Sequence, residues 1–169
     1  MKESDLSVHC RVEISDPGWD VDESLLKTLV ARALHLMGPE LATIPGIRHS
    51  VGVSCYFVPA ERMQALNREQ RGTDAVTDML SFPLGYPLPG TGWVLGDIVI
   101  CLDAIEQKAA SSGNQMPDQL VFSLVHSLLH LLGLDHLKEQ DRLRMEQREE
   151  EVFRGIAGHG APEVARRLA

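Results

Sequence analysis

Hydrophobic and polar positions alternate along two stretches of the chain, residues 7–14 and 48–58. This period of two is typical of half-buried strands. Residues 22–37 instead repeat their apolar positions at helical spacing, with Asp22 as a candidate N-cap and Gly38 opening a Gly-Pro stop. The first part of the chain therefore predicts a strand, a helix and a second strand, separated by turns and loops.

The rest of the chain continues this mixture. The pattern predicts, in chain order, a short helix opened by Pro59 and ending near residue 67, a polar loop over 67–78, a short strand over 79–82, an exposed Pro/Gly-rich connection over 83–92, a buried strand over 95–101, and helices over 102–112, 117–132 and 138–154. Residues 155–169 are expected to be flexible. Such a chain predicts an α+β fold in a single domain over residues 1–169, with a small, mostly four-stranded mixed sheet covered by helices.

Composition narrows the class of protein. The 169 residues are enough for one domain with a buried core, and the net charge of −8 argues against a surface coated in positive charge, although a local basic cleft remains compatible with it. The apolar runs are too short to span a membrane and the first residues lack the apolar core of a signal peptide, so a cytoplasmic protein is expected. Cys10, Cys55 and Cys101 are far apart in sequence and are expected to be buried thiols in a reducing compartment.

One segment, residues 126–136, carries three histidines. His126 and His130 are four residues apart, so a helix presents both on one face. His136 can join them only if the helix ends and the chain doubles back, and a glycine three residues after His130 suits that reversal. Three imidazoles with an open fourth position are typical of catalytic Zn²⁺ held on a zincin-like helix, and Ni²⁺ or another divalent metal is an alternative. The competing interpretation, three unrelated core histidines, is disfavoured by the spacing.

The residue after the first histidine separates two kinds of chemistry. Metzincin proteases share this ligand spacing but carry glutamate there as the general base. Here the position is Ser127, whose hydroxyl is no base at neutral pH, so conventional proteolysis is disfavoured. A zinc-bound water is then the expected nucleophile. The general base is unassigned: Asp97 and Asp135 are candidates, either as bases or as groups that orient imidazoles, and a turn or capping role is the alternative for each.

Four segments together resemble the bacterial YbeY family of endoribonucleases and rRNA maturation factors. The resemblance implies one metal-dependent hydrolase domain that holds zinc through His126, His130 and His136. It also implies a single-strand-specific endoribonuclease that acts in 16S rRNA 3′-end maturation, ribosome biogenesis and 70S ribosome quality control, with the small ribosomal subunit and ribosomal proteins as partners. The matching segments are Leu66-Asn67-x-x-x-Arg71-Gly72-x-Asp74, Thr77-Asp78-x-Leu80-Ser81-Phe82-Pro83, Leu95-Gly96-Asp97-Ile98-Val99-Ile100 and His126-x-x-Leu129-His130-Leu131-Leu132-Gly133-x-Asp135-His136.

The family's functional arginine falls on Arg71. A guanidinium is always charged, forks onto phosphate oxygens and would stabilise the charge that develops during phosphodiester cleavage. The alternative is that Arg71 pairs with Asp74 or Asp78 to hold its loop. Three residues depart from the family's pattern: Ser127 replaces a glycine, Gln70 an aromatic residue and Val76 a proline. The first departure bears on water access at the metal, and the other two on the shape of the loop that carries the arginine.

Two other functions fit the same residues. One is a metal hydrolase of another substrate, since the ligand spacing belongs to zincins generally. The other is a non-catalytic ribosome assembly factor whose fold is stabilised by zinc. The basic residues Arg62, Arg68 and Lys108 either extend a basic cleft for RNA or form a solvated surface. Attack by water and attack by the ribose 2′-OH both remain open.

Overall fold

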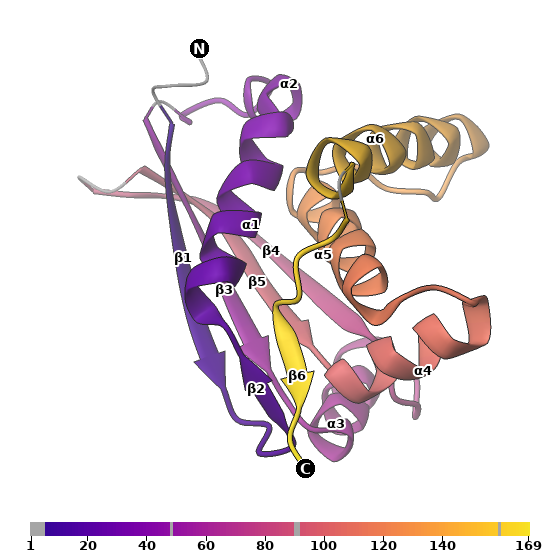
Figure 1. Cartoon of the computed structure of the whole chain (residues 1–169). Helices are drawn as coiled ribbons and strands as arrows, with labels where there is room; N and C mark the ends of the chain where they lie inside the picture. The colour runs from indigo at the N-terminus through magenta and orange to yellow at the C-terminus, as the bar shows by residue number, and fades with distance from the viewer. Residues whose placement is uncertain (1–5, 48, 90–91, 159) are drawn as a thin grey trace.

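The computed structural model describes residues 6–47, 49–89, 92–158 and 160–169. Its centre is a four-stranded sheet in the order β1-β3-β5-β4. The first three of these strands are parallel and β4 runs antiparallel to β5 (Figure 1). A separate two-stranded antiparallel sheet joins β2 to β6. The strands are β1 (Ser7–Ile14), β2 (Trp19–Val21), β3 (Ser50–Phe57), β4 (Met79–Leu88), β5 (Gly92–Ile100) and β6 (Ala165–Arg167).

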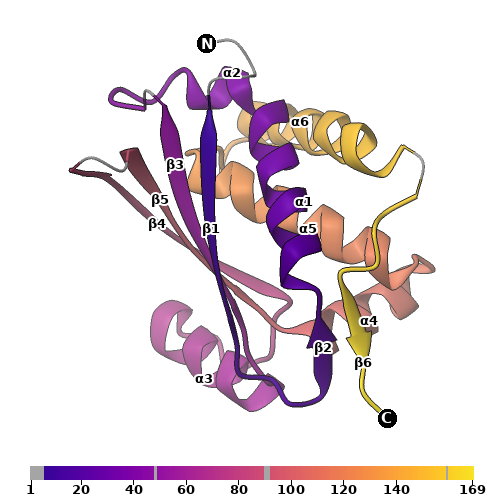
Figure 2. The ribbon, with the colours of Figure 1, turned by 60° about the vertical axis from the view of Figure 1, so that its left-hand side comes forward.

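Helices cover both faces of the large sheet. α1 and α5 pack on one face with α6 outside them, and α3 packs on the other face (Figures 1 and 2). The helices are α1 (Glu23–Leu36), α2 (Gly38–Leu41), α3 (Ala60–Arg71), α4 (Leu102–Ser112), α5 (Met116–Leu131) and α6 (Glu139–Ala157). This arrangement confirms the predicted α+β single domain with a four-stranded mixed sheet. Within the described ranges, no helix has both the length and the apolar character needed to cross a membrane.

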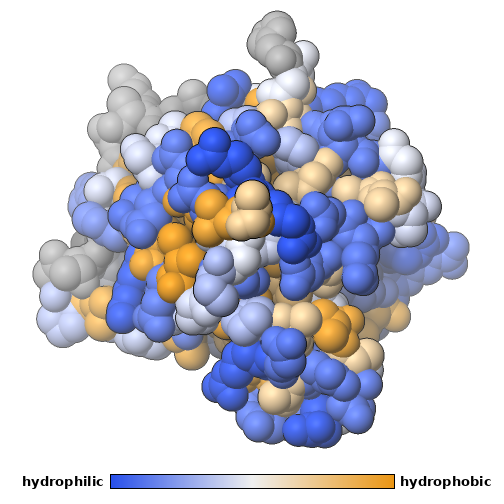
Figure 3. All heavy atoms as spheres, turned by 60° about the horizontal axis from the view of Figure 1, so that its bottom comes forward, coloured by the Kyte–Doolittle hydropathy of each residue, from blue (hydrophilic) through white to orange (hydrophobic). Residues whose placement is uncertain are grey.

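The alternating pattern of the sequence explains the core. Along β3, Val51, Val53, Cys55 and Phe57 are all buried in the main cluster, while the residues between them are only partly buried. This face packs against α1 and α5. A smaller cluster on the opposite face contains Met63 of α3. Seen from the side that lies at the bottom of Figure 1, the surface is mostly hydrophilic, with apolar residues in separate patches (Figure 3). This is expected of a molecule whose apolar residues gather in two interior clusters.

A glycine allows the most buried helix to approach the sheet closely. α5 contributes leucines and valines along most of its length to the main core. It crosses the sheet where β5 carries Gly96, at a φ of 151°. A Cβ atom at this position would lie 2.2 Å from the carbonyl oxygen of Phe82 and 3.0 Å from a methyl carbon of Leu131 on α5. The hydrogen atom of glycine is therefore required both for the β4–β5 pairing and for the position of α5.

Replacing Gly96 with alanine is expected to lower the free energy of unfolding by about 3 kcal/mol, because the backbone must shift to relieve the clash. Urea unfolding followed by circular dichroism measures the change. Gly52→Ala is the matched control in a neighbouring strand: a Cβ there has only an ordinary contact, 3.8 Å from the carbonyl oxygen of His9, and φ is not positive, so stability should stay equal or rise by up to about 1 kcal/mol. A Gly96→Ala protein as stable as wild type would contradict the close approach.

Several elements extend beyond their predicted bounds, α3 and β4 the furthest. α3 continues to Arg71 and ends at Gly72, which has a φ of 69°, because no earlier residue interrupts the helix. Arg71 is therefore the last residue of a helix and not part of a loop. β4 continues through Pro83 to Leu88, where the sequence pattern predicted an exposed connection. The proline is tolerated because β4 is an edge strand and its register with β5 shifts between Pro83 and Tyr86.

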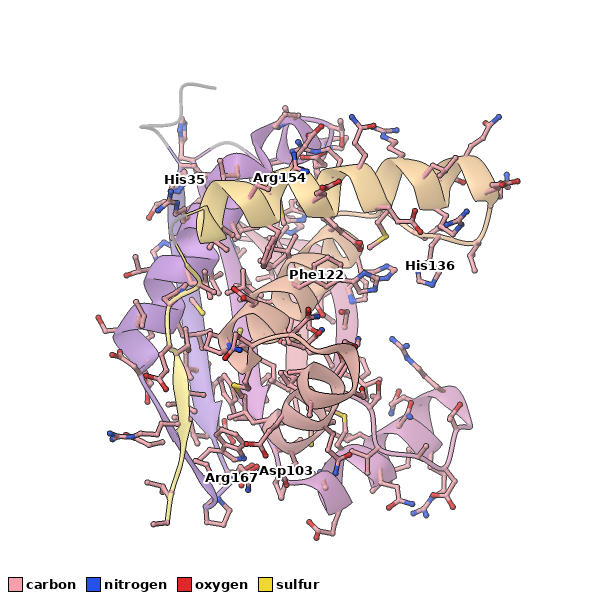
Figure 4. The ribbon with its side chains drawn as sticks, turned by 45° about the vertical axis from the view of Figure 1, so that its right-hand side comes forward. His35, Asp103, Phe122, His136, Arg154 and Arg167 are labelled. Atoms are coloured by element: carbon pink, nitrogen blue, oxygen red, sulfur yellow. The ribbon has the colours of Figure 1, made fainter. Side chains whose placement is uncertain are left out.

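The C-terminal segment differs from the predicted flexible tail. Residues 155–157 belong to α6, and residues 165–167 form β6 against β2. The guanidinium of Arg167 lies 4.5 Å from the ring centre of Trp19 and donates to Asp103 at 2.8 Å (Figure 4). The partner strand of β6 is far away in sequence, so local composition alone gives no sign of the pairing.

The thiols of Cys55 and Cys101 are free and buried, and that of Cys10 is partly exposed.

Candidate metal centre

The structure brings together the three histidines singled out from the sequence. His126 and His130 lie on the same face of α5, and their Nε2 atoms are 3.0 Å apart. The helix ends after Leu131, and the amides of Gly133 and Leu134 return to the carbonyls of His130 and Leu129. This is a Schellman cap, and the glycine has the left-handed φ of 90° that such a cap uses.

The reversal places His136 back beside α5. One ligand atom from each of the three imidazoles lies within 4.8 Å of the other two. These rings border a cavity of about 490 Å³ between α5, α6, the start of β4 and the end of α3 (Figure 4). Three converging nitrogen donors beside an open cavity fit a transition-metal ion that retains a free coordination position.

The surroundings of the central histidine favour its ligating form. Burial lowers the pKa of His130 below its usual value, and electrostatic repulsion from the neighbouring imidazoles of His126 and His136 lowers it further. The charge of Arg71 contributes in the same direction. His130 is therefore neutral near pH 7, which is the state in which an imidazole nitrogen binds a metal ion.

A carboxylate from α6 orients the first histidine. Glu149 is only 5% exposed, and its Oε1 accepts a hydrogen bond from Nδ1 of His126. This contact leaves Nε2 of His126 for a metal ion, the usual role of an outer carboxylate at a histidine site. Glu149 opens an acidic run, residues 149–151, of the kind that usually forms a solvated helix face, but its own side chain is buried. The signal lay in the packing stripe of α6, because Glu149 shares the buried side with Met145 and Val152.

Replacing Glu149 with alanine is expected to weaken metal binding roughly 10–100-fold, because His126 loses the acceptor that orients its ring. Competition with a chromophoric chelator measures the dissociation constant, and circular dichroism checks the fold. Glu150→Ala is the matched control, since that side chain is exposed and pairs with Arg154 instead. A Glu149→Ala protein with wild-type metal affinity would show that the hydrogen bond has no influence on the site.

Arg71 lies at the cavity with its charge uncompensated. In the part of the chain that the structure describes, no carboxylate forms an ion pair with Arg71. The two acidic residues considered as its partners are engaged elsewhere: Asp74 pairs with Arg68 at 3.4 Å and Asp78 with Lys108 at 2.8 Å. Arg71 and Lys108 line the cavity, whereas Arg62 and Arg68 are not among the lining residues.

A polar cluster forms the cavity wall between β4 and α4. Burial raises the pKa of Asp78, but hydrogen bonds from Lys108, Ser123 and the Met79 amide outweigh burial, so the pKa falls below its usual value. Asp78 is therefore ionised near neutral pH and compensates the charge of Lys108. Arg142, on α6, pairs with Glu146 at 2.6 Å in the same way. Among the described residues that line the cavity, this leaves Arg71 as the arginine or lysine without an ion-pair partner.

The loop that follows Arg71 is fixed from α3. The side chain of Asn67, only 5% exposed, donates to the carbonyl of Ala75 at 2.8 Å. Gln70 and Val76, where the chain departs from the family's pattern, are both exposed. The contact that anchors the loop therefore does not depend on either of them.

The third departure, Ser127, is buried at the cavity wall. Its hydroxyl donates to the sulfur of Met79 at 3.4 Å, so this group is engaged with β4.

The two candidate general bases, Asp97 and Asp135, lie away from the cavity. Asp135 is exposed and accepts from the amide of Leu137 at 3.1 Å, which is a turn role. Asp97 alternates with Ile98, which packs in the main core, so its side chain belongs to the sheet face that α3 covers. Neither carboxylate is among the residues that line the cavity.

Comparisons with known proteins identify relatives of this chain. The family model for endoribonuclease YbeY matches residues 12–157. A protein of that name from Pelotomaculum thermopropionicum is 40% identical over 137 residues, which cover 79% of this chain and 87% of the relative. One from Rhizobium johnstonii is 35% identical over 149 residues, covering 85% and 86%. One from an Anaeromyxobacter species is 45% identical over 113 residues, covering 66% of this chain and 58% of the relative.

A solved structure agrees in fold. The solution structure of a protein from Thermotoga maritima superposes with a TM-score of 0.59 at 24% identity and covers 89% of this chain and 90% of that one. The architecture found here therefore has an experimental counterpart. The family model and the relatives at 35–45% identity show that the chain belongs to the endoribonuclease YbeY family.

Proposed function

We propose that this protein is a metal-dependent endoribonuclease that cuts single-stranded RNA, with the 3′ end of 16S rRNA on the small ribosomal subunit as its substrate. It would act in the cytoplasm, in ribosome maturation and quality control, with ribosomal proteins as further partners. The observation that carries the proposal is the convergence of three imidazoles and an unpaired guanidinium on one cavity. Membership of the family supplies the class of reaction.

The residues divide the work of phosphodiester cleavage. His126, His130 and His136 would hold the ion, for which Zn²⁺ is the first candidate and Ni²⁺ or another divalent metal the alternative. When bound, the ion supplies Lewis-acid chemistry and lowers the pKa of water. Arg71 would bind phosphate oxygens and stabilise the negative charge that develops on them. Glu149 keeps the imidazole of His126 in the ligating orientation.

The carboxylates of the cavity are all committed to other contacts. Of the described residues that line it, Asp78 binds Lys108 and Ser123, Glu146 binds Arg142, and Glu149 binds His126. Since Asp97 and Asp135 also lie outside the cavity lining, the proposal includes no carboxylate as general base. The proton of the attacking group would then leave to solvent, whether that group is water or a ribose 2′-OH.

The test is cleavage of a labelled RNA that carries the 16S 3′ end, offered as a single strand and as a duplex. Cleavage of the single strand alone, its loss with a chelator and its return with Zn²⁺ are expected. Parallel reactions with Ni²⁺ and Mn²⁺ rank the metals. Hydrolysis of a peptide substrate without RNA cleavage would instead indicate a different metal hydrolase. Binding to the small subunit without cleavage by the metal-loaded protein would indicate an assembly factor.

A further inference from the structure

One aromatic side chain in the cavity has no part in the chemistry described so far. Phe122 lies on α5, four residues before His126, and lines the same cavity. Its side chain is 39% exposed, whereas the leucines and valines of α5 are buried. In Figure 4 it lies below α6, on the helix that carries the first two histidines. An exposed phenylalanine on an otherwise buried helix has its free surface toward whatever enters the cavity.

A second aromatic ring contacts Phe122 without stacking face to face on it. Phe153 of α6 packs against the main core and meets Phe122 edge to face, with ring centres 6.1 Å apart and planes at 68°. Single exposed apolar residues are common on protein surfaces. This one differs because its ring is braced from the core side and borders a cavity that also contains the histidine cluster. Because Phe153 already restricts the Phe122 ring, less side-chain entropy is lost when a flat ligand binds to it.

The spacing along α5 suits one nucleotide. Four residues of helix place Phe122 about 6 Å along the axis from His126. A nucleobase and the phosphate attached to the same sugar can therefore contact the ring and the histidine cluster together. Ser123 and Lys108, which both bind Asp78, line the same cavity as the ring. An apolar face for the base thus shares the cavity with polar groups and with the unpaired cation Arg71, which is available for phosphate.

We propose that Phe122 is a base-stacking platform for an unpaired nucleobase next to the scissile phosphate. This inference rests on the proposed function, since it names how that site selects its substrate. Aromatic side chains stack on every base, so the contact tolerates different sequences but requires an unstacked base. A base inside a duplex is stacked on its neighbours and cannot reach the ring. The platform therefore accounts for single-strand preference at the site itself.

The experiment compares intact RNA with RNA that lacks one base. The metal-loaded protein is given single-stranded substrates with an abasic nucleotide at each position around the cleaved bond. Wild type should lose roughly tenfold in kcat/KM at one position, mainly through KM, and Phe122→Ala should lose about the same on intact RNA. That variant should then be indifferent to the abasic substitution. Phe122→Trp, which retains a stacking surface, should recover most of the loss.

A direct signal separates stacking from a structural role. 2-Aminopurine is placed at the sensitive position of the RNA. Its fluorescence should be quenched when the RNA binds to wild type, before cleavage occurs, and should be quenched much less on binding to Phe122→Ala. Tyr86→Ala removes an exposed aromatic residue from β4, outside the cavity lining, and should behave as wild type. Two results would overturn the stacking platform. One is a Phe122→Ala variant that loses as much kcat/KM, relative to wild type, on abasic RNA as on intact RNA. The other is a Phe122→Ala variant with the kinetics of wild type on intact RNA.

The outcome also separates the two proposals. If wild type binds the RNA with quenching but does not cut it with any metal, the endoribonuclease proposal fails and the stacking subsite stands. If wild type cuts the RNA, and if wild type and Phe122→Ala respond alike to every abasic position and quench 2-aminopurine alike, the subsite fails and the endoribonuclease proposal stands.

Discussion

Replacing His130 with alanine is expected to abolish both metal binding and RNA cleavage while the fold persists. His130 lies between the other two candidate ligands, and its Nε2 atom is 3.0 Å from that of His126. Loss of one of three donors should weaken metal binding by more than the roughly 10–100-fold expected from loss of an outer hydrogen-bond partner. Elemental analysis of the purified protein, together with the RNA cleavage assay, measures both effects.

The fold of this variant decides what the metal does. The core of α5 consists of leucines and valines on other positions of the helix, so circular dichroism and the melting temperature should stay close to wild type. His9→Ala, at an exposed position on β1, is the matched control and should retain metal and activity. Collapse of the His130→Ala fold would identify a structural ion and favour the assembly-factor alternative.

Replacing Arg71 with alanine is expected to reduce kcat by about 10²–10³-fold without changing the metal content, because the variant loses a charge directed at the developing negative oxygen. The structural cost should be small. Arg71 is exposed at the end of α3 and forms no ion pair within the described residues, so its removal orphans no carboxylate. Single-turnover cleavage with saturating protein measures the chemical step apart from binding.

Two further variants sharpen this test. Arg71→Lys keeps the charge but loses the planar fork, so its rate should lie between those of wild type and Arg71→Ala. Arg68→Ala lies one turn earlier on the same helix and removes the pair with Asp74 instead. It should cleave at close to the wild-type rate. Undiminished cleavage by Arg71→Ala would remove the arginine from the mechanism, and loss of metal from that variant would assign it to the metal site.

Local sequence patterns were sufficient where one helix or one cap determines the outcome. The helix over residues 102–112 was predicted with its observed bounds because a glycine ends it. The reversal at Gly133 followed from the reach of a histidine side chain, and the structure has it as a helix cap with a φ of 90°. Both features depend on interactions within a few residues, which a single sequence displays directly.

Features that depend on distant segments were missed. β2 is three residues long, and its partner β6 lies at the other end of the chain. The face of Asp97 is determined by the stacking of helices on a sheet, and a strand pattern alone does not say which face meets α5. Glu149 looked like one of a run of surface acids, because the histidine that it binds belongs to another helix. In each case the missing information was a tertiary contact.

The pairing of the two ends of the chain also creates an optical probe. Trp19 is one of two tryptophans. Its indole is only 5% exposed, donates to Asp103 at 3.1 Å and lies under the guanidinium of Arg167. Release of β6 would free this indole from its cationic cover and admit water to it. With Trp93 replaced by phenylalanine, the emission wavelength of the remaining tryptophan would follow the docking of the C-terminal strand separately from global unfolding.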